Sequence, residues 1–290
     1  MAVDINRSTV PMPSSISSEI WQKTQEDSAV MSLARKIELP GLGVTIPIIT
    51  GDPEAAWIAE TEKSPVKRGT FTTKLMTSYI LSVTVPFSNQ FLRDEAALCK
   101  ALIDRLPRAL AKKFDATVFG AVAAPGENFD TLKNCVEQDI STNAYKGLVA
   151  ADTDIATNDG ILNAWVLSPQ GKAILLNAVD TNKRPLFLNN VAEGAVPMIL
   201  GSRTMQSKGA YIPDTTSSNK EVIGFAGDWT QAVYGVVEGI RAAYADQATL
   251  DDGDSKINLF QQDMFAVRAD MEVGFRCDPT VFNKLTKATT

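Results

Sequence analysis

The most regular hydrophobic pattern in the chain lies between residues 89 and 120. Apolar side chains recur there at every fourth position, as on one face of an α-helix, with acidic residues near the start and lysines near the end, as the helix dipole favours. The repeating positions are Leu98, Leu102, Leu106, Leu110, Phe114 and Val118. We predict a long amphipathic helix that ends at Gly120 and is kinked at Pro107, because an internal proline removes a backbone hydrogen bond.

Alternating apolar and polar positions, typical of half-buried β-strands, mark three other segments. They lie at residues 44–48, 79–85 and 264–277. The third has about 13 alternating residues and must lie along a long sheet. Residues 51–69, between the first two strands, are mostly polar, so we expect a projecting hairpin that cannot bury a core of its own. Its backbone edges and Trp57 then need a partner molecule to cover them.

The other segments have shorter patterns. Residues 1 to about 40 combine prolines and serines with scattered apolar positions, which predicts an extended arm with a short helix. Residues 145–255 mix short helices and strands between turn residues, as in a compact α/β subdomain. The predicted helices are Asn158–Asn163 and Gln170–Ala178, and the predicted strands are Ala164–Leu167, Met198–Leu200, Val222–Ala226 and Ala232–Val237.

Composition then narrows the class of protein. With 44% hydrophobic and 21% charged residues, the 290-residue chain is expected to fold as one or two domains. Its apolar runs are much shorter than the roughly 18 residues of a membrane span, and its first residues show no secretory signal. The cysteines Cys99, Cys135 and Cys277 form no CxxC pair, so we expect buried free thiols. A net charge of -6 opposes non-specific binding to DNA.

Candidate catalytic chemistry is sparse. The sequence has no histidine, which removes the commonest general base, and no GxSxG, P-loop or HExxH motif. Gly171-Lys172 lacks the P-loop spacing and is interpreted as a helix N-terminus with a solvated lysine. The acidic run at residues 251–254 lacks the EF-hand pattern and is interpreted as a hairpin turn. We expect no catalytic, cofactor or metal site, and no enzyme.

Several stretches resemble the tailed-phage major capsid protein family. The most specific lie near the C-terminus, and they are Gly227–Gly235, Gly239–Arg241, Asn258–Met264, Val267–Ala269 and Asp278-Pro279. Two resemblances lie upstream. The residues similar to the family's extended loop are Trp57–Glu60, Pro65, Phe71 and Lys74-Leu75, and the segment similar to its spine helix is Asp94–Asp115. The similarity covers roughly residues 40–285.

The resemblance implies an α+β fold of the Hong Kong 97 type. Residues 1–42 would form an N-terminal arm, and residues 43–82 an extended β-hairpin loop. A peripheral domain with the long spine helix would combine residues 83–145 and 256–290. Residues 146–255 would form the axial domain. Residues 255–290 are accordingly expected to pack beside the spine helix.

The resemblance also implies a structural function. Copies would assemble into the hexamers and pentamers of an icosahedral virion capsid, in the host cytoplasm, and enclose double-stranded DNA without reading its sequence. An acidic lining would repel that DNA. We expect portal and scaffolding proteins as partners, and no membrane. The sequence does not state whether a decoration protein binds. The alternatives are an encapsulin-like compartment that encloses an enzyme and a soluble metabolic enzyme.

Six residues at the loop tip are the candidate intersubunit contacts. They are Trp57, Glu60, Glu62, Lys63, Lys67 and Arg68. The glutamates have no apolar surroundings that would shift their pKa values, so they are interpreted as solvated or as partners of the nearby cations. Some relatives crosslink a loop lysine or remove an N-terminal scaffolding region. We expect neither a crosslink at Lys63, Lys67 or Lys74 nor cleavage of the arm, and a separate scaffolding protein or none.

Overall fold

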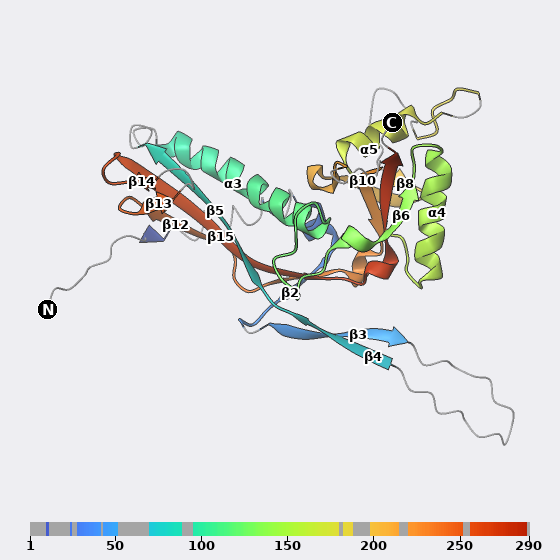
Figure 1. Cartoon of the computed structure of the whole chain (residues 1–290), viewed down its shortest axis with the longest axis horizontal. Coiled ribbons are helices and arrows are strands. Elements are labelled where there is room, and N and C mark those ends of the chain that lie inside the picture. The colour runs from blue at the N-terminus through green and yellow to red at the C-terminus, as the bar shows by residue number, and fades with distance from the viewer. Residues whose placement is uncertain are drawn as a thin grey trace, which may run out of the picture.

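The structure is a computed structural model, and it combines two packed units with a projecting hairpin (Figure 1). Each unit consists of a β-sheet and helices. The hairpin extends away from both units. The structure describes residues 10–11, 24, 28–41, 43–51, 70–88, 95–179, 182–187, 198–214, 220–251 and 256–288.

The first unit is built from helix α3 (Glu95–Val118) and a sheet around the 13-residue strand β15 (Met264–Arg276). β15 pairs with β5 along one edge, and with β12 and β11 in succession along the other. β1 then pairs with β12, and β2 with β11. The remaining elements are β1 (Val10–Pro11), α2 (Ala29–Leu33), β2 (Arg35–Glu38), β5 (Tyr79–Ser88), β11 (Val233–Val236), β12 (Arg241–Ala245), β13 (Thr249–Asp251) and β14 (Lys256–Asn258).

The long helix and the long strand confirm the two strongest sequence patterns. The repeat positions of α3 that are buried against the sheet include Leu106, Leu110, Phe114 and Val118. Phe114 packs against Phe275 of β15, with ring centroids 6.4 Å apart. α3 continues through Pro107 as one helix and ends before Gly120, whose φ of 84° suits glycine.

The second unit is a six-stranded sheet with two helices. The strand order is β6-β16-β10-β7-β9-β8. Trp165 and Leu167 of β7 share a core with both helices, whereas Ala164 and Val166 on the opposite face join the core of the first unit. The two units therefore pack directly against each other. The elements are β6 (Val136–Asp139), α4 (Ala144–Thr157), β7 (Ala164–Leu167), α5 (Pro169–Asn177), β8 (Met198–Ile199), β9 (Ser202–Gln206), β10 (Lys220–Gly227) and β16 (Phe282–Ala288).

The short elements were predicted unevenly. All four short strands predicted between residues 145 and 255 are present as β7, β8, β10 and β11, and α5 covers most of the predicted helix Gln170–Ala178. The predicted helix Asn158–Asn163 is wrong, because Asn158 is the C-cap of α4 and Asp159 has a positive φ of 59°. The helix in this region, α4, lies before that segment and was not predicted.

The C-terminal segment does not pack as one body. β15 lies beside the long helix, as expected for residues 255–290, but β16 pairs with β10 and β6 in the second sheet. Conversely, β11 and β12, which come from the middle of the chain, belong to the first sheet. The chain therefore crosses between the two units more often than its sequence pattern indicates.

The projecting hairpin consists of β3 (Val44–Gly51) and β4 (Thr70–Met76), which pair antiparallel from Val44–Met76 to Gly51–Thr70. The sequence pattern indicated residues 79–85 as the second strand of this hairpin. That segment is part of β5, and it pairs with β15 instead. Only Thr77 and Ser78 separate the hairpin from the first sheet.

Candidate functional site

The hairpin leaves the body at a closely packed root around Met76. This side chain is fully buried, and the small core that surrounds it consists of Leu39, Met76 and Val233. Glycines allow the strands to approach each other here. A Cβ atom on Gly43 would lie 2.5 Å from the Met76 carbonyl oxygen, one on Gly235 would lie 2.6 Å from Met76 Sδ, and one on Gly274 would lie 2.6 Å from the Thr77 carbonyl oxygen. Larger residues would push the hairpin off its root.

A charged cluster fastens β4 to the body beside this root. Arg276 donates from Nε to the Leu75 carbonyl oxygen (2.9 Å), from Nη1 to Asp130 Oδ1 (2.8 Å) and from Nη2 to Asn128 Oδ1 (2.9 Å). Lys74 Nζ lies 3.3 Å from Asp130 Oδ2. The Arg276 side chain is only 9% exposed, so water screens these bonds weakly. We call Lys74, Asn128, Asp130 and Arg276 the root clamp.

Lys74 has its partners within its own chain. Besides Asp130, its ammonium group donates to the carbonyl oxygen of Cys277 over 3.1 Å. Both contacts tie β4 to the end of β15 and to Asp130. The other two candidate lysines, Lys63 and Lys67, lie outside the described residues.

The N-terminal region is tied to the long helix through Asp115 of α3. This carboxylate accepts hydrogen bonds from the Ser28 hydroxyl (2.6 Å) and from the backbone N–H of Ala29 (3.1 Å) at the start of α2. It also accepts a bond from the hydroxyl of Ser207 (2.8 Å), which follows β9 of the second unit. One buried side chain therefore joins α2, α3 and the second sheet. Its burial raises the pKa of Asp115, whereas the bonds from Ser28 and Ser207 act in the opposite direction.

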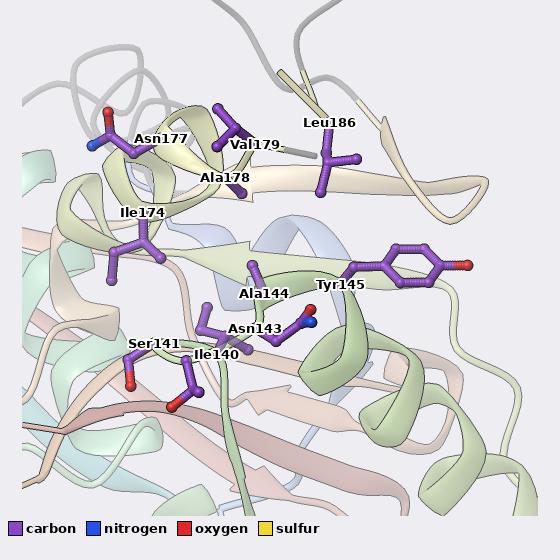
Figure 2. Close-up of a pocket in the computed structure, with 11 residues that line it drawn as sticks. Ile140, Ser141, Asn143, Ala144, Tyr145, Ile174, Asn177, Ala178, Val179 and Leu186 are labelled. Carbon is purple, nitrogen blue, oxygen red and sulfur yellow. The ribbon is translucent and has the colours of Figure 1, made fainter. Parts of the chain in front are cut away.

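The second unit carries a hollow of about 640 Å³ between the start of α4 and the end of α5. Figure 2 shows Asn177, Ala178, Val179 and Leu186 on one side of it and Ile140, Ser141, Asn143 and Ala144 on the other. Tyr145, Val179 and Leu186 are about half exposed at its rim. The lining that the structure describes contains no carboxylate, lysine or arginine. It therefore lacks the converging titratable groups of an active site.

The six predicted contact residues, Trp57, Glu60, Glu62, Lys63, Lys67 and Arg68, all lie outside the described residues, and so does the centre of the acidic run at 251–254. The strands that flank this run, β13 and β14, do pair as a hairpin. Gly171 and Lys172 lie in the first turn of α5, so the predicted helix N-terminus is present; Ser168 caps it, and the Lys172 side chain is partly buried.

In the described part of the chain, two kinds of feature are at issue, membrane-spanning helices and metal-binding clusters. Its helices include none long and apolar enough to cross a bilayer. Nor do its Cys, Asp and Glu side chains gather anywhere in a group that would hold a metal ion. Cys135 and Cys277 are buried free thiols, as the sequence predicted for them, and Cys99 has no described side chain.

Sequence reasoning missed both Asp115 and the root clamp. A weak signal was present for Asp115, since it follows Phe114 and is four residues from Ala111, both buried positions of the helix. An acidic residue beside an apolar stripe indicates a buried hydrogen-bond acceptor. The clamp gave no such signal, because Arg276 and Asp130 are 146 residues apart.

Comparison with known proteins gives consistent results. The model of a family described as "Phage capsid family" matches residues 9–278. The probable major capsid protein of Mycobacterium phage L5 is 28% identical over 287 residues, which cover 92% of this chain and 86% of that protein. A solved structure from Mycobacterium phage Ogopogo has a TM-score of 0.74 at 15% identity, with 90% of this chain and 92% of that one covered. A structure titled as the capsid of an empty GTA particle, computed with C5 symmetry, has a TM-score of 0.64 at 13% identity, covering 91% and 90%. These two likenesses concern the fold.

Proposed function

The chain belongs to the phage capsid family, and from this premise we propose that it is the major capsid protein of a tailed bacteriophage. Its copies assemble into hexamers and pentamers of an icosahedral shell, which encloses double-stranded DNA without reading its sequence. The observation that carries the proposal is the family match, which extends over nearly the whole chain. The shared α+β capsid fold supports it.

The projecting hairpin suits a subunit that is completed by its neighbours. Among the described residues, β3 and β4 pair only with each other. An isolated two-stranded ribbon is marginally stable in water, and its outer edges present unpaired backbone groups. A neighbouring copy in a shell would cover these edges.

The two packed units are the basis for assigning the two domains that the family resemblance implies. We assign the unit of α3 and β15 to the peripheral domain, and the unit of α4, α5 and β10 to the axial domain near the centre of each capsomer. The resemblance places the arm at residues 1–42 and the extended loop at residues 43–82; because residues 79–82 belong to β5 of the first unit, the extended loop in this proposal is the hairpin of β3 and β4. The crossing of β11, β12 and β16 between the units makes both domains discontinuous.

The loop tip makes the contacts with the next copy. The six contact residues there combine one large aromatic ring with two carboxylates and three cations, and they are Trp57, Glu60, Glu62, Lys63, Lys67 and Arg68. A single exposed ion pair contributes about 0 to 1 kcal/mol. Repetition over every copy of a closed shell multiplies such modest contacts into a stable assembly.

The remaining functional expectations follow from this role. The protein is a structural subunit and not an enzyme, and it assembles in the host cytoplasm with portal and scaffolding proteins. The alternative of an encapsulin-like compartment receives no support from the curated relatives, which are named as phage major capsid proteins.

Electron microscopy tests the proposed function directly. The purified chain, expressed with its own scaffolding protein where one is encoded, should form closed shells of uniform diameter in negative stain. Shells from infected cells should contain nuclease-protected DNA. A chain that stays monomeric at micromolar concentration under both conditions would refute the proposal, and an enclosed enzyme in place of DNA would favour the compartment.

A further inference from the structure

The direction of the hairpin depends on a small part of the molecule. β3 and β4 form a sheet separate from those of both units, and β4 meets the body at its last residues, Lys74 to Met76. The bonds of the root clamp and the packing around Met76 are located there. The clamp therefore lies where a small change of angle moves the whole hairpin.

We propose that the root clamp sets the angle at which the hairpin leaves the body, and thereby positions the loop tip on the next copy during shell assembly. The second part of this inference rests on the proposed function, whereas the first part concerns the single chain. Arg276 and Asp130 are positioning residues in this proposal. They act through β4 and need not touch the neighbouring copy.

The geometry of Arg276 fits such a role. Its planar guanidinium group holds three acceptors from two segments, the Leu75 carbonyl on β4 and the side chains of Asn128 and Asp130. A guanidinium fork fixes direction as well as distance, which a single ammonium group does not. The cluster thus restrains the rotation of β4 about its point of exit.

Asp130 gives the clamp a rigid support. Its backbone N–H donates to the Phe275 carbonyl oxygen (3.1 Å), and its Oδ2 accepts a bond from the backbone N–H of Cys277 (3.3 Å). Asp130 is therefore tied to the residues on both sides of Arg276. A displacement of Asp130 away from the clamp would therefore break its bonds to the backbone at the end of β15.

A small rotation at the root has a large effect at the far end. The eight residues of β3 span about 26 Å at the usual rise of a strand. A rotation of about 10° would displace the end of β3 by roughly 5 Å, far more than the few tenths of an ångström that a hydrogen bond tolerates. Contacts made by the tip therefore require a fixed root.

The first part can be tested by measuring the distance between two spin labels, one on Thr70→Cys at the far end of the hairpin, opposite Gly51, and one on Lys113→Cys at an exposed position of α3. The full-length chain carries Cys99→Ser and is diluted with unlabelled chain, so that each distance lies within one copy. We expect a narrow distribution for the native clamp. Asp130→Asn should broaden it or shift its mean by roughly 5 Å, the displacement estimated above from strand geometry.

A matched control is Glu137→Gln, which removes a carboxylate that pairs with Lys284 (2.9 Å) and Lys220 (3.0 Å) in the second sheet. It should leave the distribution unchanged. If Asp130→Asn does not fold, Lys74→Gln, at a partly exposed position, provides the same test. A distribution as narrow as that of the native chain, with the same mean, in a folded clamp variant would overturn the proposal.

The role of the root clamp in shell assembly, the second part of the proposal, is measured separately. Folded clamp variants that melt within a few degrees of the native chain should form uniform shells at a yield lower by tenfold or more, with open sheets or irregular particles in negative stain, whereas Glu137→Gln should assemble normally. Altered distances with normal shells would overturn the role in assembly. If the native chain formed no shells, the proposed function would fail, while the distances would still decide whether the clamp sets the angle.

Discussion

The hydroxyl of Ser28 donates a 2.6 Å hydrogen bond to Asp115, a residue 87 positions further along the chain. Both side chains are buried, at the point where the N-terminal region meets the long helix α3. Ser28 also caps α2, since its oxygen accepts the backbone N–H of Met31 over 3.1 Å. The pair therefore couples a local helix start to a contact between distant segments.

Replacing Ser28 by alanine should destabilise the folded chain by about 1–3 kcal/mol, because it removes a helix cap and leaves a buried carboxylate with one donor fewer. Chemical denaturation of the subunit measures this change. The control is Ser141→Ala, which removes an equally short 2.6 Å bond to Asp139 at an exposed site and should change stability by less than about 0.5 kcal/mol. Equal effects of the two substitutions would contradict the structural role of Ser28.

The ionisation of Asp115 should make stability depend on pH. Burial raises the pKa of this carboxyl above its usual 3.8, although the hydrogen bonds from Ser28 and Ser207 oppose the shift. A carboxyl with a higher pKa in the folded than in the unfolded chain binds its proton more tightly when folded. Its contribution to stability is therefore present below pH 3.8 and is lost as the pH rises through the folded pKa.

The measurement compares the native chain with Asp115→Asn in urea denaturation over the range of about pH 3 to pH 7. The free energy of unfolding of the native chain relative to the variant should fall as the pH rises. Asp139→Asn is the control, since at this exposed carboxyl the effect of burial is outweighed by hydrogen bonds from Ser141 and Thr142, which hold its pKa below the usual range. A relative stability that increased with pH would mean that hydrogen bonding outweighs burial at Asp115.

Gly235→Ala should disturb the root of the hairpin, because the new Cβ would lie 2.6 Å from Met76 Sδ in a fully packed site. We expect a loss of about 1–3 kcal/mol in the free energy of unfolding. Gly239→Ala is a close control, since nothing lies within 4 Å of a Cβ at that position. Thermal melting of both variants measures their losses of stability. A smaller loss of stability for Gly235→Ala than for Gly239→Ala would show that the root repacks without strain.

The elements that the sequence predicted well are those with long, regular patterns. α3 repeats an apolar residue at every fourth position, and β15 alternates over 13 residues, and the repeat positions whose side chains the structure describes are buried in both elements. α4 was missed because its buried stripe is built largely from small residues, Ala144, Gly147 and Ala151. β4 was missed because threonine and lysine dominate it, so that β5, with its clearer alternation, was taken for the second strand of the hairpin.

The candidate site was less predictable than the fold for a related reason. The sequence reveals a polar loop tip, but the anchors that aim it are contacts between segments far apart in the chain, such as Arg276 with Leu75. Neither residue has a local pattern that differs from an ordinary strand position. Sheet order decides which strands meet, and strands such as β16 reach the second sheet by a crossover that periodicity does not encode.

The buried thiols should be unreactive in the folded subunit. Burial raises the pKa of Cys135 to about 12 and that of Cys277 well above its usual value. Because the thiolate is the reactive species, less than about one part in a thousand of Cys135 is available near pH 8, and the raised pKa of Cys277 disfavours its thiolate too. In a Cys99→Ser background, Ellman's reagent should label neither thiol of the native chain within minutes and both after unfolding in guanidinium. Rapid labelling of the native chain would show that the core around β15 opens readily.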